Sequence, residues 1–197
     1  VISIMFDNSI EFIISYLGII KAGKIVHIIS PSISKKNFLE QIKSCNPKII
    51  LTLKKFIGEF ETIQNKIKLV DFYEFESENI SKKKSEISDI SSLMYTSGTT
   101  SSPKGVPIKH ENTIFTTKNI VNVLKYTNSD IDVIPLSLSH SFGLGCLHTS
   151  LFVGSTLNLH KNTMNILEIL NSIKKNNATT FAAVPATLTL RSEEHTS

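Results

Sequence analysis

At the centre of the chain lies a polar sequence, Tyr95-Thr96-Ser97-Gly98-Thr99-Thr100-Ser101-Ser102-Pro103-Lys104-Gly105-Val106. It is rich in hydroxyl side chains and holds two glycines, one proline and one lysine, with apolar residues before and after it. This composition predicts a loop between two strands, because glycine lets a backbone approach a ligand closely. Hydroxyls and backbone N–H groups can surround phosphate oxygens, and the lysine adds positive charge. Two interpretations remain open on composition alone: a phosphate-binding loop, or a flexible Ser/Gly linker.

Apolar patterns on both sides of this loop predict an α/β fold of mostly parallel sheets with flanking helices. Before the loop, strand-like runs alternate with helical periodicity, an order that implies parallel pairing through right-handed crossovers. Asn8 with Glu11, and then Ser34, are the predicted starts of the first two helices. The predicted strands are Val1–Phe6, Lys24–Ile29, Lys48–Leu53, Lys68–Phe72, Asp132–Leu136, Ser155–Leu159 and Ala178–Val184, and the clearest helix after the loop is Glu111–Tyr126.

Composition excludes several classes of protein. The chain has 197 residues, of which 41% are hydrophobic, enough for one domain or a large part of one. Its net charge is +4, and the lysines are scattered rather than interleaved with aromatics, which argues against a nucleic-acid partner. Polar residues interrupt every apolar stretch before it reaches the length of a membrane span. Cys45 and Cys146 have no CxxC spacing, so we expect reduced thiols and a cytoplasmic protein.

Two well-known phosphate loops do not fit the central sequence. A Walker A loop needs a glycine before its lysine and a Ser or Thr after it, and here Pro103 and Gly105 flank Lys104. A dinucleotide fingerprint needs GxGxxG between a strand and a helix, whereas Gly98 is followed by two threonines and the loop leads into a strand.

The central sequence instead resembles the Ser/Thr/Gly-rich phosphate loop of the adenylate-forming superfamily, which includes acyl-CoA synthetases, peptide-synthetase adenylation domains and luciferases. That family's pattern is roughly Tyr-Thr-Ser-Gly-Thr-Thr-Gly-x-Pro-Lys-Gly-Val, and the chain matches every defined position except Ser101, where the family usually has glycine. Further similarity lies in Lys109-His110-Glu111-Asn112, in His140-Ser141-Phe142-Gly143, and in the segment that ends at Pro185. In many relatives a proline precedes the second histidine by three residues, whereas this chain has Ser137.

The resemblance implies an enzyme that attacks the α-phosphorus of ATP with a carboxylate, releases pyrophosphate, and passes the acyl group to a thiol. ATP, Mg²⁺ and coenzyme A are the implied cofactors and co-substrate, and a small-molecule carboxylic acid is the implied substrate. Six residues are expected to bind the nucleotide phosphates: Thr96, Ser97, Gly98, Thr99, Thr100 and Lys104. Lys104 and His140 are the expected catalytic residues, and the metal ligand is expected outside this chain. The resemblance thus implies an acid–thiol ligase of fatty acid metabolism.

Both ends of the chain have unusual features. It starts at Val1 within a strand pattern, and Arg191–Ser197 holds the only arginine and no apolar residue. We therefore expect residues 1–190 to be a partial AMP-binding N-terminal domain, inactive alone, and residues 191–197 to be a non-native tail, the alternative being an ordinary polar tail.

His140 has two possible roles. It borders the carboxylate and the adenylate phosphate if the resemblance holds at this residue, or it is a buried histidine that bonds to Ser139 or Ser141. His110 is expected to be structural, at the start of a helix. Because an imidazole cannot replace the aspartate that pairs with a substrate ammonium group, a non-amino acid is the better expectation. The alternatives are an amino-acid adenylation domain of a peptide synthetase and a non-catalytic nucleotide-binding remnant.

Overall fold

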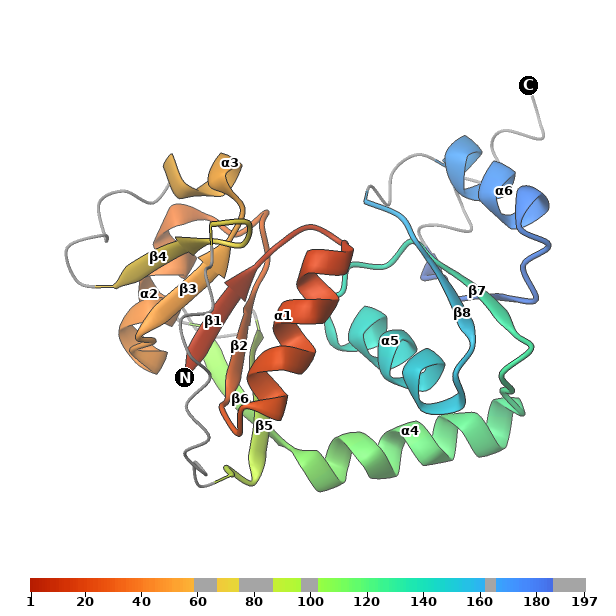
Figure 1. Ribbon diagram of the computed structural model, residues 1–197, viewed down its shortest axis with the longest axis horizontal. Helices are drawn as coiled ribbons and strands as arrows, with labels where there is room; N and C mark the ends of the chain where they lie inside the picture. The colour runs from red at the N-terminus through yellow and green to blue at the C-terminus, as the bar shows by residue number, and fades with distance from the viewer. Residues whose placement is uncertain (59–66, 75–86, 97–102, 162–165, 186–197) are drawn as a thin grey trace. The chain divides into compact units, whose positions relative to one another are not determined.

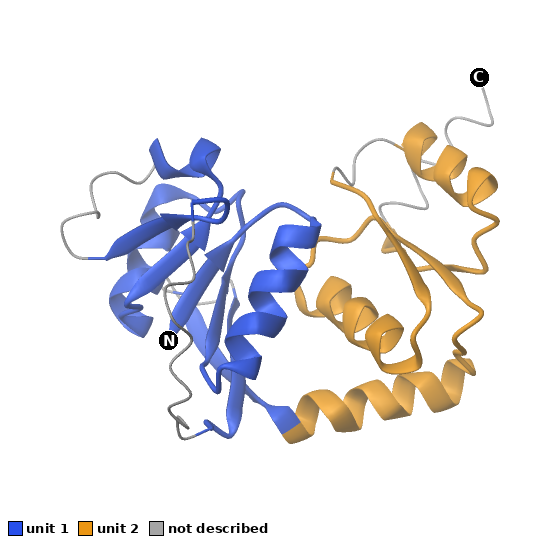
Figure 2. Cartoon of the chain, in the orientation of Figure 1, with its two compact units in different colours: residues 1–110 blue, residues 111–197 orange. Residues whose placement is uncertain are grey.

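The computed structural model describes residues 1–58, 67–74, 87–96, 103–161 and 166–185. It confirms the α/β class (Figure 1), with parallel strands joined by helices. The chain divides into two compact units, residues 1–110 and 111–197 (Figure 2), and each is described separately. Among the helices of the described ranges, none combines the length and apolarity that crossing a membrane requires.

The first unit is built on a six-stranded sheet with the order β4-β3-β1-β2-β5-β6. Its first five strands pair in parallel, and the sixth runs antiparallel to the fifth. Each helix between the first three strands supplies the crossover that parallel pairing requires. The strands are β1 (Ile2–Met5), β2 (Val26–Ile29), β3 (Ile49–Thr52), β4 (Lys68–Asp71), β5 (Ile90–Thr96) and β6 (Lys104–Lys109), and the helices are α1 (Ile10–Lys21), α2 (Lys35–Cys45) and α3 (Lys54–Ile57).

Local hydrogen bonds explain where the first two helices begin. Ser34 is the N-cap of α2, as predicted, and its hydroxyl accepts from the Asn37 N–H at 3.3 Å. The prediction of Asn8 for α1 was wrong by one residue, because the Ser9 hydroxyl accepts from the Phe12 N–H. A hydroxyl in this position satisfies one of the N–H groups that the first helical turn leaves without a partner.

The first sheet buries side chains on both faces, and α1 and α2 cover opposite faces (Figure 1). Under α2 lies one apolar cluster of Met5, Ile29, Phe38, Ile42, Ile50 and Ile67. Because side chains alternate along a strand, Ser3 and His27 share the α2 face with Met5 and Ile29 two residues further on. This face therefore combines an apolar part with a polar part.

The second unit contains a parallel three-stranded sheet with the order β8-β7-β9. The last strand is shorter than the predicted Ala178–Val184, since only its central two residues pair with β7. Val133, Leu138, Leu147 and Ile169 are fully buried and form its core. The elements are α4 (His110–Leu124), β7 (Ile131–Ile134), α5 (Ser141–Val153), β8 (Thr156–Leu159), α6 (Ile166–Lys175) and β9 (Thr180–Phe181).

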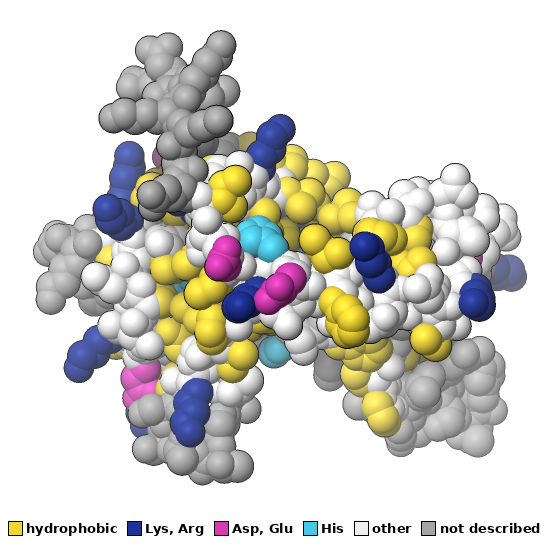
Figure 3. Space-filling model, turned by 90° about the horizontal axis from the view of Figure 1, so that it is seen from below, with side chains coloured by type: hydrophobic (Ala, Val, Ile, Leu, Met, Phe, Trp, Pro, Cys, Tyr) yellow, Lys and Arg dark blue, Asp and Glu magenta, His cyan; other side chains and the backbone are white. Residues whose placement is uncertain are grey.

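Helix α4 confirms the predicted helix at Glu111–Tyr126 but buries only Thr117. Its side chains Ile114, Phe115 and Val123 are more than half exposed. Apolar side chains are also visible at the surface among the charged ones in Figure 3. Helical periodicity thus identified the helix correctly but did not predict how much of its apolar face is buried.

Candidate functional site

The candidate phosphate loop connects two antiparallel strands. In the register of β5 and β6, Thr96 pairs with Lys104 and Tyr95 pairs with Gly105. Both Thr96 and Lys104 are exposed at the strand ends. The prediction of a strand on each side of the loop is confirmed, whereas the predicted phosphate-binding residues Ser97, Gly98, Thr99 and Thr100, together with Ser101, lie outside the described residues.

Gly105 allows the two strands to pack with an aromatic ring across their backbone. A Cβ atom at this position would lie 3.1 Å from Cζ of Tyr95 and 3.2 Å from Cδ1 of Leu93. Such distances are tighter than ordinary van der Waals contact, so the ring of Tyr95 lies directly against the residue that follows Lys104. The glycine at this position has a packing reason that is independent of any ligand.

His140 is the N-cap residue of α5 and is exposed. Its backbone N–H donates to the Ser137 carbonyl at 3.1 Å, and its carbonyl accepts from the Leu144 N–H at 2.9 Å. The interpretation of a buried histidine bonded to Ser139 or Ser141 is therefore wrong, since the imidazole is at the surface and the Ser139 hydroxyl pairs with that of Ser137 at 2.8 Å. The backbone anchors this residue and leaves the side chain at the first turn of the helix.

The segment before α5 forms a defined turn around Ser137, the position where the family resemblance suggested a proline. The hydroxyl of Ser137 accepts from the Ser139 N–H at 3.2 Å. A Cβ atom on Gly143 would lie 2.3 Å from the Ser137 carbonyl oxygen, closer than atoms can approach without movement. Gly143 is thus required because the first turn of α5 lies against this backbone.

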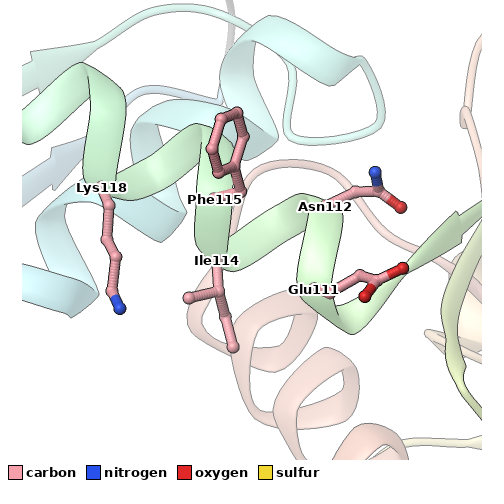
Figure 4. A pocket seen from close by; sticks show the side chains of 5 residues that line it. All are labelled: Glu111, Asn112, Ile114, Phe115 and Lys118. Carbon is pink, nitrogen blue, oxygen red and sulfur yellow. The ribbon is translucent and has the colours of Figure 1, made fainter.

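His110 and the side chains of α4 do not gather around one point. His110 begins α4, and its backbone N–H donates to the Asp89 carbonyl at 3.0 Å, which agrees with a structural role. A hollow of about 490 Å³ is lined by Glu111, Asn112, Ile114, Phe115 and Lys118 of α4. Figure 4 shows that Ile114 and Phe115 point to different sides of the helix, so these side chains do not converge on a ligand. Within the described ranges, no group of three His, Cys, Asp or Glu side chains could hold a metal ion.

Sequence reasoning missed a polar cluster beneath the hairpin, at His27, Gln41, Cys45 and Tyr95. The His27 ring is fully buried, and its centroid lies 5.1 Å from that of Tyr95. Burial lowers the pKa of His27 to about 4, so the ring is neutral near pH 7. The sequence did contain a signal, since Val26-His27-Ile28-Ile29 places one polar residue in a strand that is buried on both faces.

With this geometry in place, the comparisons with known proteins identify the class. The chain belongs to the AMP-binding enzyme family, whose sequence profile matches residues 1–195. It is 29% identical over 216 residues to the oxalate–CoA ligase of Arabidopsis thaliana, covering 100% of this chain and 42% of that protein. It is 30% identical over 162 residues to bacitracin synthase 2 of Bacillus licheniformis, covering 80% of this chain and 6% of that protein.

Solved structures agree. The o-succinylbenzoate CoA synthetase of Bacillus subtilis, in complex with an acyl-adenylate intermediate, matches with a TM-score of 0.86 and 28% identity, over 98% of this chain and 51% of that chain. The same synthetase in complex with ATP and magnesium ion also matches with a TM-score of 0.86 and 28% identity, over 98% of this chain and 41% of that one. The chain therefore has the fold of the N-terminal region of adenylate-forming enzymes, and it spans less than half the length of the curated relatives described above.

Proposed function

We propose that the complete gene product that carries this chain activates a carboxylic acid with ATP and then transfers the acyl group to coenzyme A. A carboxylate oxygen attacks the α-phosphorus, pyrophosphate leaves with its bonding electrons, and the thiol of coenzyme A later displaces AMP from the acyl carbon. The observation that carries this proposal is the hydroxyl-rich loop with Lys104, at the end of the β5–β6 hairpin. Family membership and the CoA ligases among the relatives support it.

In this proposal the loop binds the departing pyrophosphate end of ATP. Several phosphate oxygens need donors simultaneously, and hydroxyls, backbone N–H groups and a lysine are suited to that task. The assigned residues are Thr96, Ser97, Gly98, Thr99, Thr100 and Lys104. Thr96 and Lys104 are directly opposite each other in the hairpin register, where side chains start about 5 Å apart. A lysine ammonium and a threonine hydroxyl at the two ends of the loop could thus contact one phosphate group together.

Mg²⁺ would neutralise part of the triphosphate charge in this scheme, and we assign its protein ligand to a part of the enzyme outside this chain. His140 is assigned to the acyl side of the reaction, beside the carboxylate and the adenylate phosphate. Its exposed imidazole at the N-terminus of α5 supports this role, because the positive end of a helix dipole favours developing negative charge. We further propose that the substrate is a fatty acid and that the enzyme is cytoplasmic.

An amino-acid adenylation domain is the second candidate, and the 30% identity with bacitracin synthase 2 favours it. His140 argues against it, since an imidazole is a poor partner for a substrate ammonium group. A nucleotide binder without catalysis is the third candidate, with Ser101 as the departure that would mark a decayed loop.

The experiment is carboxylate-dependent exchange of pyrophosphate into ATP, measured on the complete gene product with a panel of fatty, aromatic, dicarboxylic and amino acids. We expect exchange with a non-amino acid, and a loss of about 100-fold in Lys104→Ala, because one charge-stabilising donor is typically worth that much. Lys68→Ala is the matched control, since Lys68 is also an exposed lysine that starts a strand of the same sheet. Exchange with amino acids alone would favour the second candidate, and no exchange with any acid would refute the proposal.

A further inference from the structure

The ring of Tyr95 lies between the candidate phosphate loop and the interior of the first unit. On one side it packs against Gly105, the residue after Lys104, so closely that a Cβ atom there would lie 3.1 Å from the ring. On the other side it meets the His27 ring edge-on, with an interplanar angle of 66° and 5.1 Å between centroids. Its hydroxyl makes a long contact of 3.5 Å to the backbone carbonyl of Gln41 in α2. Tyr95 thus connects both ends of the loop to β2 and α2.

His27 cannot rotate freely, because side chains from two elements fix both of its ring nitrogens. Nε2 lies 3.2 Å from Oε1 of Gln41, an acceptor, so Nε2 carries the proton. Nδ1 is then an acceptor and lies 2.9 Å from the Ser3 hydroxyl and 3.2 Å from the Cys45 sulfur. Burial raises the pKa of the Cys45 thiol, which keeps it protonated and able to donate. The ring therefore has one tautomer and one orientation.

Packing alone does not require a histidine at position 27, because buried positions on this sheet face can be apolar, as Met5 and Ile29 are. His27 instead pairs in register with the polar Ser3, whereas Met5 and Ile29, two residues further along the same strands, belong to the apolar cluster. A fully buried histidine with three side-chain partners is costly to desolvate, and its gain is directional because hydrogen bonds fix orientation where packing alone does not. The residue that this fixed ring contacts is Tyr95, one position before the predicted phosphate-binding residues.

We propose that Tyr95, held by the network of Ser3, His27, Gln41 and Cys45, is a positioning residue that fixes the spacing of Thr96 and Lys104 at the ATP phosphates. This inference rests on the proposed function. Neither Tyr95 nor His27 touches the reacting atoms, and both act through the β5–β6 hairpin. Loss of the network leaves the sheet folded and lets the two strand ends move relative to each other. A shift of about 1 Å at such a site can cost about 100-fold in rate.

The first test does not depend on catalysis. Hydrogen exchange followed by mass spectrometry on the complete gene product compares wild type with His27→Leu, and with Tyr95→Leu, whose half-buried side chain makes misfolding less of a concern. We expect faster exchange at residues 93–96 and 103–106 in both variants, by about tenfold, and unchanged exchange in β3. Ile50→Ala is the control, because Ile50 is fully buried in β3 of the same sheet and pairs with Ser3 in the strand register, but its side chain makes no hydrogen bond to the network. Equal protection of the hairpin in His27→Leu and Ile50→Ala would overturn the proposal.

The second test separates positioning from general destabilisation. In pyrophosphate exchange we expect His27→Leu to raise the KM for ATP by about 10-fold or more, with the KM for the acid changed less than about twofold. The control is Ile50→Ala, assayed at a temperature where it and His27→Leu have the same fraction of folded protein. Under these conditions Ile50→Ala should leave the KM for ATP unchanged. An unchanged KM for ATP in His27→Leu would refute the positioning role. Absence of exchange in wild type would instead refute the proposed function, and the hydrogen-exchange comparison would still decide the positioning role.

Discussion

Removing the carboxylate of Asp132 should lower the local stability of the parallel sheet in the second unit. Asp132 lies on the central strand β7 and is 4% exposed. Its Oδ2 accepts from the hydroxyl of Ser150 in α5 at 2.6 Å and from that of Ser155, just before β8, at 3.1 Å. Its Oδ1 accepts from the hydroxyl of Thr180 in β9. One buried side chain therefore joins the central strand to both neighbouring strands and to a helix.

The size of the effect follows from these three bonds. A hydrogen bond to a charged group contributes about 1.5–3 kcal/mol, but hydroxyls freed by truncation recover part of that by turning to water or to each other. We expect Asp132→Ala to lower the local free energy of unfolding by about 3–5 kcal/mol, which is the loss of three such bonds less the part that the freed hydroxyls recover. Asp132→Asn should cost about 1–2 kcal/mol, because the amide keeps one acceptor oxygen and hydroxyls can reverse their direction.

The assay is native-state hydrogen exchange at the amides of β7, β8 and β9, because global unfolding of a protein with several units is not a two-state process. Asp130→Ala is the matched control. Asp130 lies two residues earlier, nearer the surface, and also accepts three hydrogen bonds, from the N–H and hydroxyl of Thr127 and the hydroxyl of Thr179. Exchange at β7 should rise far more in Asp132→Ala than in this control. Equal effects of the two substitutions would show that burial of the carboxylate does not determine the loss of unfolding free energy.

Two further predictions concern other parts of the fold. The stability of the first unit should fall by about 2 kcal/mol between pH 7 and pH 5, because His27 has a pKa of about 4 when folded and about 6.5 when unfolded, so only the unfolded chain binds the proton in that window. Hydrogen exchange of β2 at the two pH values measures this loss of stability. His27→Leu should remove the pH dependence, and a dependence that persists in this variant would show that His27 is not its source. Gly143→Ala should cost about 1–3 kcal/mol in the thermal stability of the second unit, because its Cβ would meet the Ser137 carbonyl at 2.3 Å; Gly145→Ala, where nothing lies within 4 Å, is the control and should be neutral or slightly stabilising.

The sequence predicted most of the first sheet correctly because its strands are short apolar runs separated by well-capped helices. The strand at Ile49–Thr52 lies inside the predicted Lys48–Leu53, and the helix before it was predicted from its Ser34 cap together with the apolar periodicity that follows this cap. Such elements are determined by nearby residues, so local patterns suffice to locate them. The start of α1 was missed because Asn8 and Ser9 are both good N-caps, and only backbone geometry decides between them.

The side-chain environments were less accessible to sequence reasoning. The network around His27 draws on β1, β2, α2 and β5, which are distant in the sequence and meet only through the sheet order. His140 could be read as buried or exposed, and its exposure depends on how α5 starts against the Ser137 carbonyl. Residue type alone therefore identified candidate chemistry, whereas burial and orientation required the tertiary structure.

The antiparallel strand β6 connects the topology to the chemistry. Seven residues, 97–103, separate β5 from β6, and a parallel connection needs a crossover of about a dozen residues or more. A short polar loop between two strands therefore has to close an antiparallel hairpin, which was already implicit in the sequence although the expected pattern was mostly parallel. The hairpin also places β6 at the sheet edge, where Lys104, Pro107 and Lys109 discourage pairing with another chain. Lys104 thus has two physical reasons to lie at this strand end, and Lys104→Glu separates them, because it keeps a charged side chain at the edge while removing the positive charge that phosphate requires.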